Sequence, residues 1–148
     1  MDVVALANFF AEKELEPGPI EAWRADHCLA AALGVPVGTV VWLSYYNFLK
    51  TCLAHRDVTF AEFEKLPVIL SRGFVFRGRK RTAEICHWID GRPIKIVLKA
   101  TSKNEVYLKT FHRVHWKEAR RLFRRAKDEQ SLCREPETEL AQQLMSRQ

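Results

Sequence analysis

The chain has no apolar run near the ~20 residues that a membrane-spanning helix needs. Its first ten residues, MDVVALANFF, lack the basic start and the small-residue cleavage site of a secretory signal. These two absences predict a cytoplasmic protein with no membrane partner. The cysteines lie far apart, with no C-x-x-C pair and no histidines at zinc-ligand spacing, so we expect reduced thiols at Cys28, Cys52, Cys86 and Cys133.

Motifs for phosphate binding and for nucleophilic catalysis are also missing. The glycines form neither G-x-x-x-x-G-K-[ST] nor G-x-G-x-x-G, which argues against sites for nucleoside triphosphates and dinucleotides. No G-x-S-x-G nucleophile elbow is present. The carboxylates of the second half are scattered rather than grouped for a divalent metal, at Glu84, Asp90, Glu105 and Glu118. We therefore expect no metal and no cofactor.

What the chain does have is a strong separation of charge. Its 148 residues suit one domain and carry a net charge of +6. Residues 71–127 hold 17 Lys and Arg against 4 Asp and Glu, a balance of +13, whereas the rest of the chain has a balance of −7. A block of one sign attracts anions, so we expect nucleic acid as the first candidate partner.

The first 38 residues have the pattern of two helices. An apolar stripe indicates a helix over 3–15, which EPGP at 16–19 would stop. Apolar residues then recur at helical spacing from Ile20 to Leu33, and Pro19 suits the first turn of that helix. We expect this N-terminal helical element, residues 1–38, to precede the main domain.

The next segment combines strand and helix signals. TVVWL at 39–43 is short, β-branched and apolar, which is typical of a strand. Ser44 is a suitable N-cap for a helix over 45–55. A further short helix, capped by Thr59, is expected to end at Pro67.

From residue 73 the hydrophobic period changes from helical to two. Four segments alternate as strands do, namely FVF (74–76), AEICHWI (83–89), PIKIVLKAT (93–101) and EVYLKTFHRV (105–114). The sequences DG and SKN between the later segments suit tight turns. This arrangement predicts an antiparallel β-meander.

A basic helix and a tail complete the predicted order. Residues 116–127, WKEARRLFRRAK, place apolar residues on one side of a helix and Lys and Arg on the other. The remaining residues, 129–148, are polar and acidic in balance, so we expect a mobile helix or a tail. The predicted fold is α+β, with N-terminal helices, a four-stranded antiparallel meander and a basic C-terminal helix, and its main domain spans 39–128.

The two turns determine which residues share a side of the meander. With DG as turn residues and a three-residue loop at 102–104, one face collects Ile85, Ile89, Ile94, Ile96, Leu98, Val106, Leu108 and Val114. The other face collects Trp88, Lys95, Lys99, Thr101, Tyr107, Lys109, Phe111, Arg113 and His115. A two-residue loop would move Thr110 and His112 across the sheet, so their side stays open.

Cations that alternate with aromatic rings on a sheet face favour single-stranded nucleic acid. Lys and Arg contact phosphates, while unstacked bases pack on the rings. We predict RNA-binding residues on this face and in the adjoining loop RGRKR, namely Arg79, Lys80, Lys95, Tyr107, Lys109, Phe111, Arg113 and His115. The alternative is that these charges only keep an exposed sheet face soluble.

RNA cleavage without a metal needs a base for the 2′-hydroxyl, an acid for the leaving 5′-oxygen and cations around the phosphorane. A histidine titrates near ~6.5 and can serve as base or acid. The chain offers His55, His87, His112 and His115 in or near the compact region. Lys99, Lys109 and Arg113 are candidates to hold the phosphate.

Two long segments resemble a known group of nuclease domains. VVWLSYYNFLKTCLAHRDVTFAEFEKLPVIL (40–70) and KIVLKATSKNEVYLKTFHRV (95–114) resemble the phage and prophage RNase domains grouped with barnase, EndoU, colicin-type tRNases and RelE. The shared features are a Ser-capped helix, a His before an LP-x-IL segment, a Lys in the penultimate strand and a Thr-Phe pair in the last. Here these places hold Ser44, His55, Lys99, and Thr110 with Phe111.

The resemblance implies a metal-independent ribonuclease fold whose catalytic candidates are His55, Lys99 and Thr110, with Lys109 and Arg113 as phosphate contacts. His112 departs from the group, which commonly has an aromatic or small polar residue there, and it adds a candidate proton-transfer group. The implied partners are RNA (tRNA or mRNA) and an acidic inhibitor, antitoxin or phage structural protein. Two alternatives stay open: a non-catalytic module that binds RNA or single-stranded DNA, and an interaction protein that docks on an acidic partner.

Overall fold

The structure, a computed structural model, describes residues 19–44, 47–48 and 60–146. These residues form an α+β fold around a seven-stranded mixed sheet with the order β1-β2-β6-β5-β4-β3-β7. The strands are β1 (Ile20–Arg24), β2 (Val40–Leu43), β3 (Phe74–Arg77), β4 (Thr82–Ile89), β5 (Arg92–Ala100), β6 (Val106–Arg113) and β7 (Leu132–Arg134). The helices of the described ranges are α2 (His27–Leu33), α4 (Phe60–Phe63), α5 (Leu66–Arg72), α6 (Trp116–Asp128) and α7 (Thr138–Met145). None of these helices is long and apolar enough to cross a bilayer.

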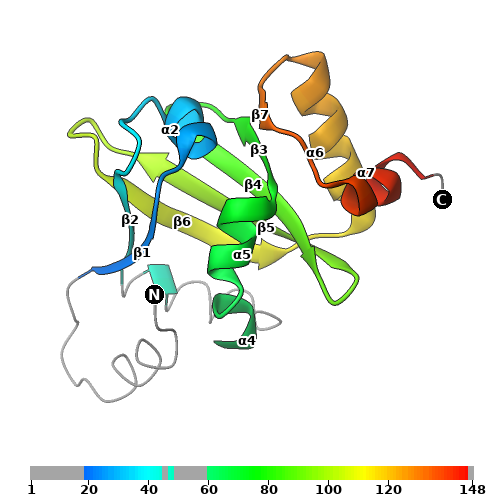
Figure 1. The fold of residues 1–148 in the computed structure, drawn as a ribbon, viewed down its shortest axis with the longest axis horizontal. Coiled ribbons are helices and arrows are strands. Elements are labelled where there is room, and N and C mark those ends of the chain that lie inside the picture. The colour runs from blue at the N-terminus through cyan, green and yellow to red at the C-terminus, as the bar shows by residue number, and fades with distance from the viewer. Residues whose placement is uncertain (1–18, 45–46, 49–59, 147–148) are drawn as a thin grey trace.

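Helices pack on both faces of the sheet. Figure 1 shows α2 and α5 lying across one face, which we call the first face. There Leu33 and Ile69 pack in one buried cluster with Ile85, Ile96 and Leu108 of the meander. On the second face, α6 and α7 form a separate buried cluster with side chains of β3 and β4. These two helices therefore cover the second face mainly at its β3–β4 end, and α6 also contacts β5.

The described chain begins with a strand, so the prediction of a helix from Ile20 is wrong at its start. Residues Ile20–Arg24 pair antiparallel with β2. The backbone N–H and C=O groups on the outer edge of β2 need hydrogen-bond partners, and β1 supplies them. The helix begins only at His27, because Asp26 caps it by accepting a hydrogen bond from the Leu29 N–H at 2.9 Å. The helix predicted over 3–15 lies outside the described residues.

The predictions for the next segment are confirmed in part. The strand at Val40–Leu43 is present, and the Ser44 hydroxyl accepts the N–H of Asn47 at 3.1 Å, as an N-cap does. Thr59 and most of the helix predicted over 45–55 lie outside the described residues. The helix expected to stop at Pro67 ends earlier, at Phe63, and Pro67 occupies the first turn of a separate helix, α5.

The predicted antiparallel meander is confirmed as β3, β4, β5 and β6. Asp90 and Gly91 have φ values of 52° and 74°, the left-handed pair of a two-residue hairpin turn. Ile89 lies opposite Arg92, as predicted. In the next hairpin, Thr101 donates its backbone N–H to the Glu105 carbonyl at 2.8 Å.

A β-bulge in β6 changes the predicted register of its second half. Leu98 lies opposite Leu108, as expected, but Val97 lies opposite Thr110, so Lys109 is an extra residue. Beyond the bulge every side chain points to the side opposite the predicted one. The prediction that Phe111 and Arg113 share a face with Lys95 and Lys99 is therefore wrong.

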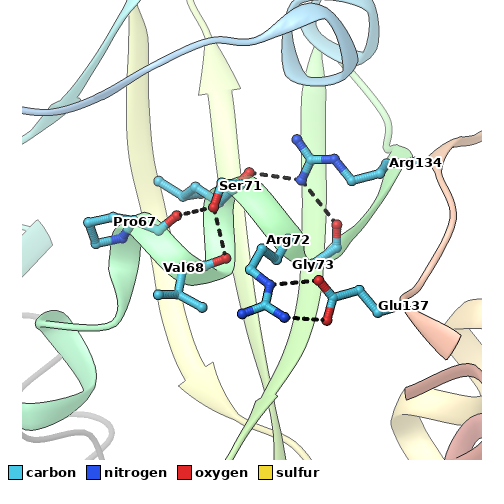
Figure 2. A network of polar contacts seen from close by, with 8 residues as sticks. Pro67, Val68, Ser71, Arg72, Gly73, Arg134 and Glu137 are labelled. Carbon is cyan, nitrogen blue, oxygen red and sulfur yellow. Dashed lines mark hydrogen bonds and ion pairs between the residues drawn. The ribbon is translucent and has the colours of Figure 1, made fainter. Parts of the chain in front are cut away.

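The segment expected as a tail joins the sheet and the buried core. β7 pairs antiparallel with β3, and Leu140 and Leu144 of α7 are buried. Figure 2 shows two arginines that fasten this segment to the end of α5. Arg134 donates to the carbonyls of Leu70 and Gly73 and to the Asp26 carboxylate, and Arg72 makes two hydrogen bonds with Glu137.

Candidate nucleic-acid interface

Most of the predicted site lies on the part of the second face that β2, β6 and β5 form, beside the part that α6 and α7 cover. We call it the meander face, and we define it by Trp42, Lys95, Val97, Lys99, Tyr107, Thr110 and His112, with Thr82 and Glu84 at its border with α6. These side chains point to one side because the strand register pairs them across β2, β6, β5 and β4.

Register arranges the meander face in three rows. The first row runs from Trp42 through Tyr107 and Lys99 to Thr82. The second row contains Thr110, Val97 and Glu84, and the third contains His112 and Lys95. Directly opposed side chains on such a face have Cβ atoms roughly 5 Å apart, and diagonal neighbours lie at roughly 7–8 Å. The bulge thus brings Thr110 and His112 to the same side as both lysines, which settles the side that the sequence left open.

The Thr110 hydroxyl is buried and has no hydrogen-bond partner among the described residues. A buried hydroxyl without a partner costs about 1–3 kcal/mol, so such groups are uncommon and call for an explanation. His112 is half-buried in the next row, with its Nδ1 atom inside the protein. A hydroxyl and an imidazole on one side of the strand, next to lysines, form a set of groups that can hold and protonate a phosphate ester.

The two lysines of the meander face differ in their partners. Lys95 forms an ion pair with Glu84 at 2.7 Å, and both side chains are largely buried, at 14% and 13% exposed. Glu84 also lies 3.8 Å from Arg125 of α6. Lys99 has no ion pair within the described ranges, so its ammonium group is the more available of the two for a bound anion.

An aromatic pair stands beside Lys99. Trp42 and Tyr107 are direct neighbours on the parallel strands β2 and β6, and both are half-buried. The Tyr107 hydroxyl donates to Glu105 at 2.8 Å, and this hydrogen bond raises the pKa of the tyrosine. Sequence reasoning missed Trp42, since no local pattern tells that β2 pairs with a strand more than 60 residues later.

Four of the predicted RNA-binding residues are exposed near the ends of the meander. Arg79 and Lys80 lie in the β3–β4 turn that leads into Thr82, at the Lys99 end of the first row. Lys109 is the exposed bulge residue, and His115 precedes α6 at the other end of β6. His55 lies outside the described residues.

Phe111 and Arg113 lie on the first face, away from the other candidates. Phe111 is fully buried and packs edge-on against Phe63 at 4.9 Å between ring centroids. Arg113 forms an ion pair with Glu62 at 2.7 Å and donates to the Ile89 carbonyl at 2.9 Å. Neither side chain can contact RNA on the meander face, so these two assignments are corrected. The cause is the bulge, which reverses the side of every later residue in β6.

Two further titratable groups of β4 are buried: Cys86 continues the third row next to Lys95, and His87 lies on the first face. Burial raises the pKa of the Cys86 thiol to about 12, so this cysteine is an inert thiol under the α6 cluster. Burial lowers the pKa of His87, which is 4% exposed on the first face and whose Nδ1 has no hydrogen-bond partner among the described residues. Cys28 and Cys133 are free thiols as well. Within the described ranges, no three His, Cys, Asp or Glu side chains gather in a metal-binding arrangement.

No family model, curated protein or solved structure matches this chain. The functional argument therefore depends on the chemistry of the meander face. The groups on it are two ammonium groups, the hydroxyls of Thr110 and Tyr107, one imidazole and two aromatic rings, and the Glu84 carboxylate at its border is held by Lys95.

Proposed function

We propose that the protein is a metal-independent endoribonuclease that binds RNA on the meander face and cleaves it there. The observation that carries the proposal is the bulge at Lys109, which aligns Thr110 and His112 with Lys95 and Lys99. If β6 alternated regularly from Leu108 onward, Thr110 and His112 would lie on the first face and Phe111 on the meander face. The extra residue reverses all three of these side chains.

The chemistry of each group suits the transesterification of RNA. A base removes the proton of the 2′-hydroxyl, the 2′-oxygen attacks phosphorus, and the bond to the 5′-oxygen breaks as that oxygen takes a proton from an acid. The products are a 2′,3′-cyclic phosphate and a free 5′-hydroxyl. His112 is the imidazole of the meander face that can transfer one of these protons.

Lys99 and Thr110 would hold the phosphate during this reaction. An ammonium group stabilises the extra negative charge of the phosphorane, and a hydroxyl donates a hydrogen bond to a non-bridging oxygen. The Thr110 hydroxyl, which has no hydrogen-bond partner in the described part of the chain, is thereby given a ligand partner. His55, which the resemblance to phage RNase domains marks as the second proton-transfer group, is the candidate to complete the site.

The aromatic pair gives the substrate a place for its bases. Unpaired bases stack on tryptophan and tyrosine rings, with about 1–3 kcal/mol for each base. Trp42 and Tyr107 lie in the first row, where Tyr107 is the direct neighbour of Lys99. A base on these rings therefore places the adjoining phosphate near the lysine. This arrangement favours unpaired RNA at the cleaved bond.

The test is incubation of the purified protein with total RNA and with tRNA in EDTA, followed by analysis of the new ends. We expect discrete fragments with cyclic phosphate ends. Lys99→Ala, Thr110→Val and His112→Ala should each reduce the cleavage rate by roughly 100-fold or more. Lys65→Ala, an exposed lysine next to α5, is the matched control and should cleave like the wild type. Intact RNA with the wild type, or equal cleavage by all variants, would refute the proposal.

A second candidate is a non-catalytic module that binds RNA or single-stranded DNA on the same rows. The row of Trp42, Tyr107 and Lys99 favours it, because stacking and phosphate contact need no proton transfer. This module would shift RNA in gels with a steep salt dependence and leave it uncut. The incubation described above therefore separates the two functions directly.

A further inference from the structure

α6 divides its cations between two flanks with different surroundings. Arg120 donates to the Gln143 carbonyl of α7 and stacks over Trp116, and Lys127 lies over the Phe123 ring. Arg120 thus joins α6 to α7, whereas Lys127 packs on its own helix. Four other cations of α6 are exposed, Lys117, Arg121, Arg124 and Arg125, and we call them the α6 strip.

The cations of the α6 strip contribute little to the stability of the fold. Lys117 and Arg124 have no ion pair within the described ranges. Arg121 is 73% exposed and reaches Glu118 only at 4.0 Å, and Arg125 is 50% exposed at 3.8 Å from Glu84. Contacts this long and this exposed contribute little stability. The opposite side of the helix, with Ala119, Leu122 and Ala126, supplies the packing.

The α6 strip is continuous with the meander face through one carboxylate. Glu84 contacts Lys95 of the meander face with one oxygen and Arg125 of the strip with the other. A bound anion that follows the cations from Lys99 to Lys95 would meet Arg125 next. The cations of the meander face and of the α6 strip are therefore neighbours, and the largely buried carboxylate of Glu84 lies between them.

The spacing of the strip matches a nucleic-acid backbone. Its residues stand at positions i, i+4, i+7 and i+8 of the helix, so they span about 12 Å along the helix axis at ~1.5 Å for each residue. One strand of a duplex has a phosphate about every 3.4 Å along its axis. Four cations over this length therefore face three or four consecutive phosphates. The strip has no aromatic side chain, so it cannot stack bases or read them.

We propose that the α6 strip is a second RNA-binding surface that holds the backbone of a base-paired stem while the adjoining unpaired loop lies on the meander face. This inference rests on RNA being the ligand of the meander face, as in the proposed function, and it names the substrate class as a stem–loop RNA. The aromatic pair selects unpaired bases, and the strip adds contacts that only a longer, structured RNA reaches. Its contribution is independent of sequence and depends on salt.

The test compares two labelled 2′-O-methyl RNAs, which cannot undergo attack by a 2′-hydroxyl. One is a stem–loop, and the other is the isolated single-stranded loop. The strip variant is Arg121→Gln/Arg124→Gln, and the control variant is Lys65→Gln/Arg77→Gln, which removes the same charge from exposed positions outside α6. Fluorescence anisotropy over a range of salt gives the affinity and the salt slope, and urea unfolding shows that each variant is folded.

We expect the strip variant to bind the stem–loop about tenfold more weakly than the control variant, with a salt slope smaller by roughly two. Both variants should bind the isolated loop equally. Equal affinities for the stem–loop would overturn the inference. It would also be overturned if the strip variant lost only binding to poly-glutamate, because the strip would then serve an acidic protein.

A parallel assay with ordinary RNA keeps this inference separate from the proposed function. If the wild type fails to cleave but the strip variant loses affinity for the stem–loop, the ribonuclease proposal fails and the second surface stands. If the wild type cleaves and the strip variant binds the stem–loop normally, the second surface fails and the ribonuclease stands.

Discussion

Arg113 of β6 and Glu62 of α4 form an ion pair at 2.7 Å with side chains only 7% and 12% exposed. The pair joins the strand that carries the candidate site to the helices of the first face. Its position inside the protein makes it sensitive to the loss of either partner, since a buried charge left alone is costly.

Removal of one partner of this ion pair should destabilise the protein strongly. We expect Arg113→Met to lower the free energy of unfolding by about 3–5 kcal/mol, measured by urea denaturation. The double variant Arg113→Met/Glu62→Leu should recover a large part of that loss, because no uncompensated charge remains. A single variant within about 1 kcal/mol of the wild type would contradict a buried pair.

Thr110→Val separates stability from activity. Valine has the shape of threonine but no hydroxyl, and the Thr110 hydroxyl has no hydrogen-bond partner within the described ranges, so we expect equal or higher stability, by up to about 1–3 kcal/mol. Cleavage should fall, because the phosphate loses a donor. Thr110→Ser, which keeps the hydroxyl, should retain most of the activity. A clear loss of stability in Thr110→Val would mean that the hydroxyl has a structural role.

Two single-residue deletions test the bulge. Deletion of Lys109 or of Thr110 removes the extra residue, and both leave Phe111 opposite Ile96 on the first face. Only the deletion of Lys109 keeps a threonine opposite Val97. We expect both variants to fold, as judged by cooperative urea unfolding, and only the variant that retains Thr110 to cleave RNA. Equal activity of the two would show that the hydroxyl is not used.

His87 should make stability depend on pH. Burial lowers its pKa in the folded protein below the ordinary value of 6.5, so the unfolded chain takes up the proton first as the solution is acidified. The free energy of unfolding should therefore fall as the pH drops below about 6.5. His87→Leu should flatten this dependence between pH 7.5 and 5.5 in urea titrations. Parallel curves for the two proteins would rule out His87 as the source.

The predictable parts of the fold are those with local signals. DG at Asp90 and Gly91 sets a turn that needs two left-handed residues, and the alternation around it assigns Ile85, Ile94 and Ile96 to the buried side. Both follow from the chemistry of a few adjacent residues, and both are confirmed. The basic helix is confirmed for the same reason, since its apolar stripe repeats within 13 residues.

The parts that could not be predicted depend on distant partners. Ile20 and Trp23 have helical spacing, but the pairing of β1 with β2 outweighs that weak local preference. β7 is three residues long, and its position in the sheet depends on its pairing with β3. The tail therefore has little signal of its own.

The candidate site was predicted in composition but not in detail. Lys95, Lys99 and Tyr107 precede the bulge, so the hairpin turns were enough to place them. Lys109 is not a glycine, and the sequence shows only that two polar residues, Lys109 and Thr110, stand together between Leu108 and Phe111, which does not tell which of them is the extra residue. Thr110, Phe111, His112 and Arg113 could therefore be assigned to faces only once the register was known.

The order of strands also has a consequence for how the chain folds during synthesis. Strands β4, β5 and β6 are joined by short turns, so this meander can pair as soon as its residues are available. The parallel pairing of β2 with β6 and the pairing of β7 with β3 each close loops of more than 50 residues, which are slow to form. Because β7 follows every other strand of the described sheet in the chain, this sheet cannot be complete until residues 132–134 have left the ribosome. The order of the strands thus makes the pairing of β7 with β3 the last step of sheet formation that becomes available during synthesis.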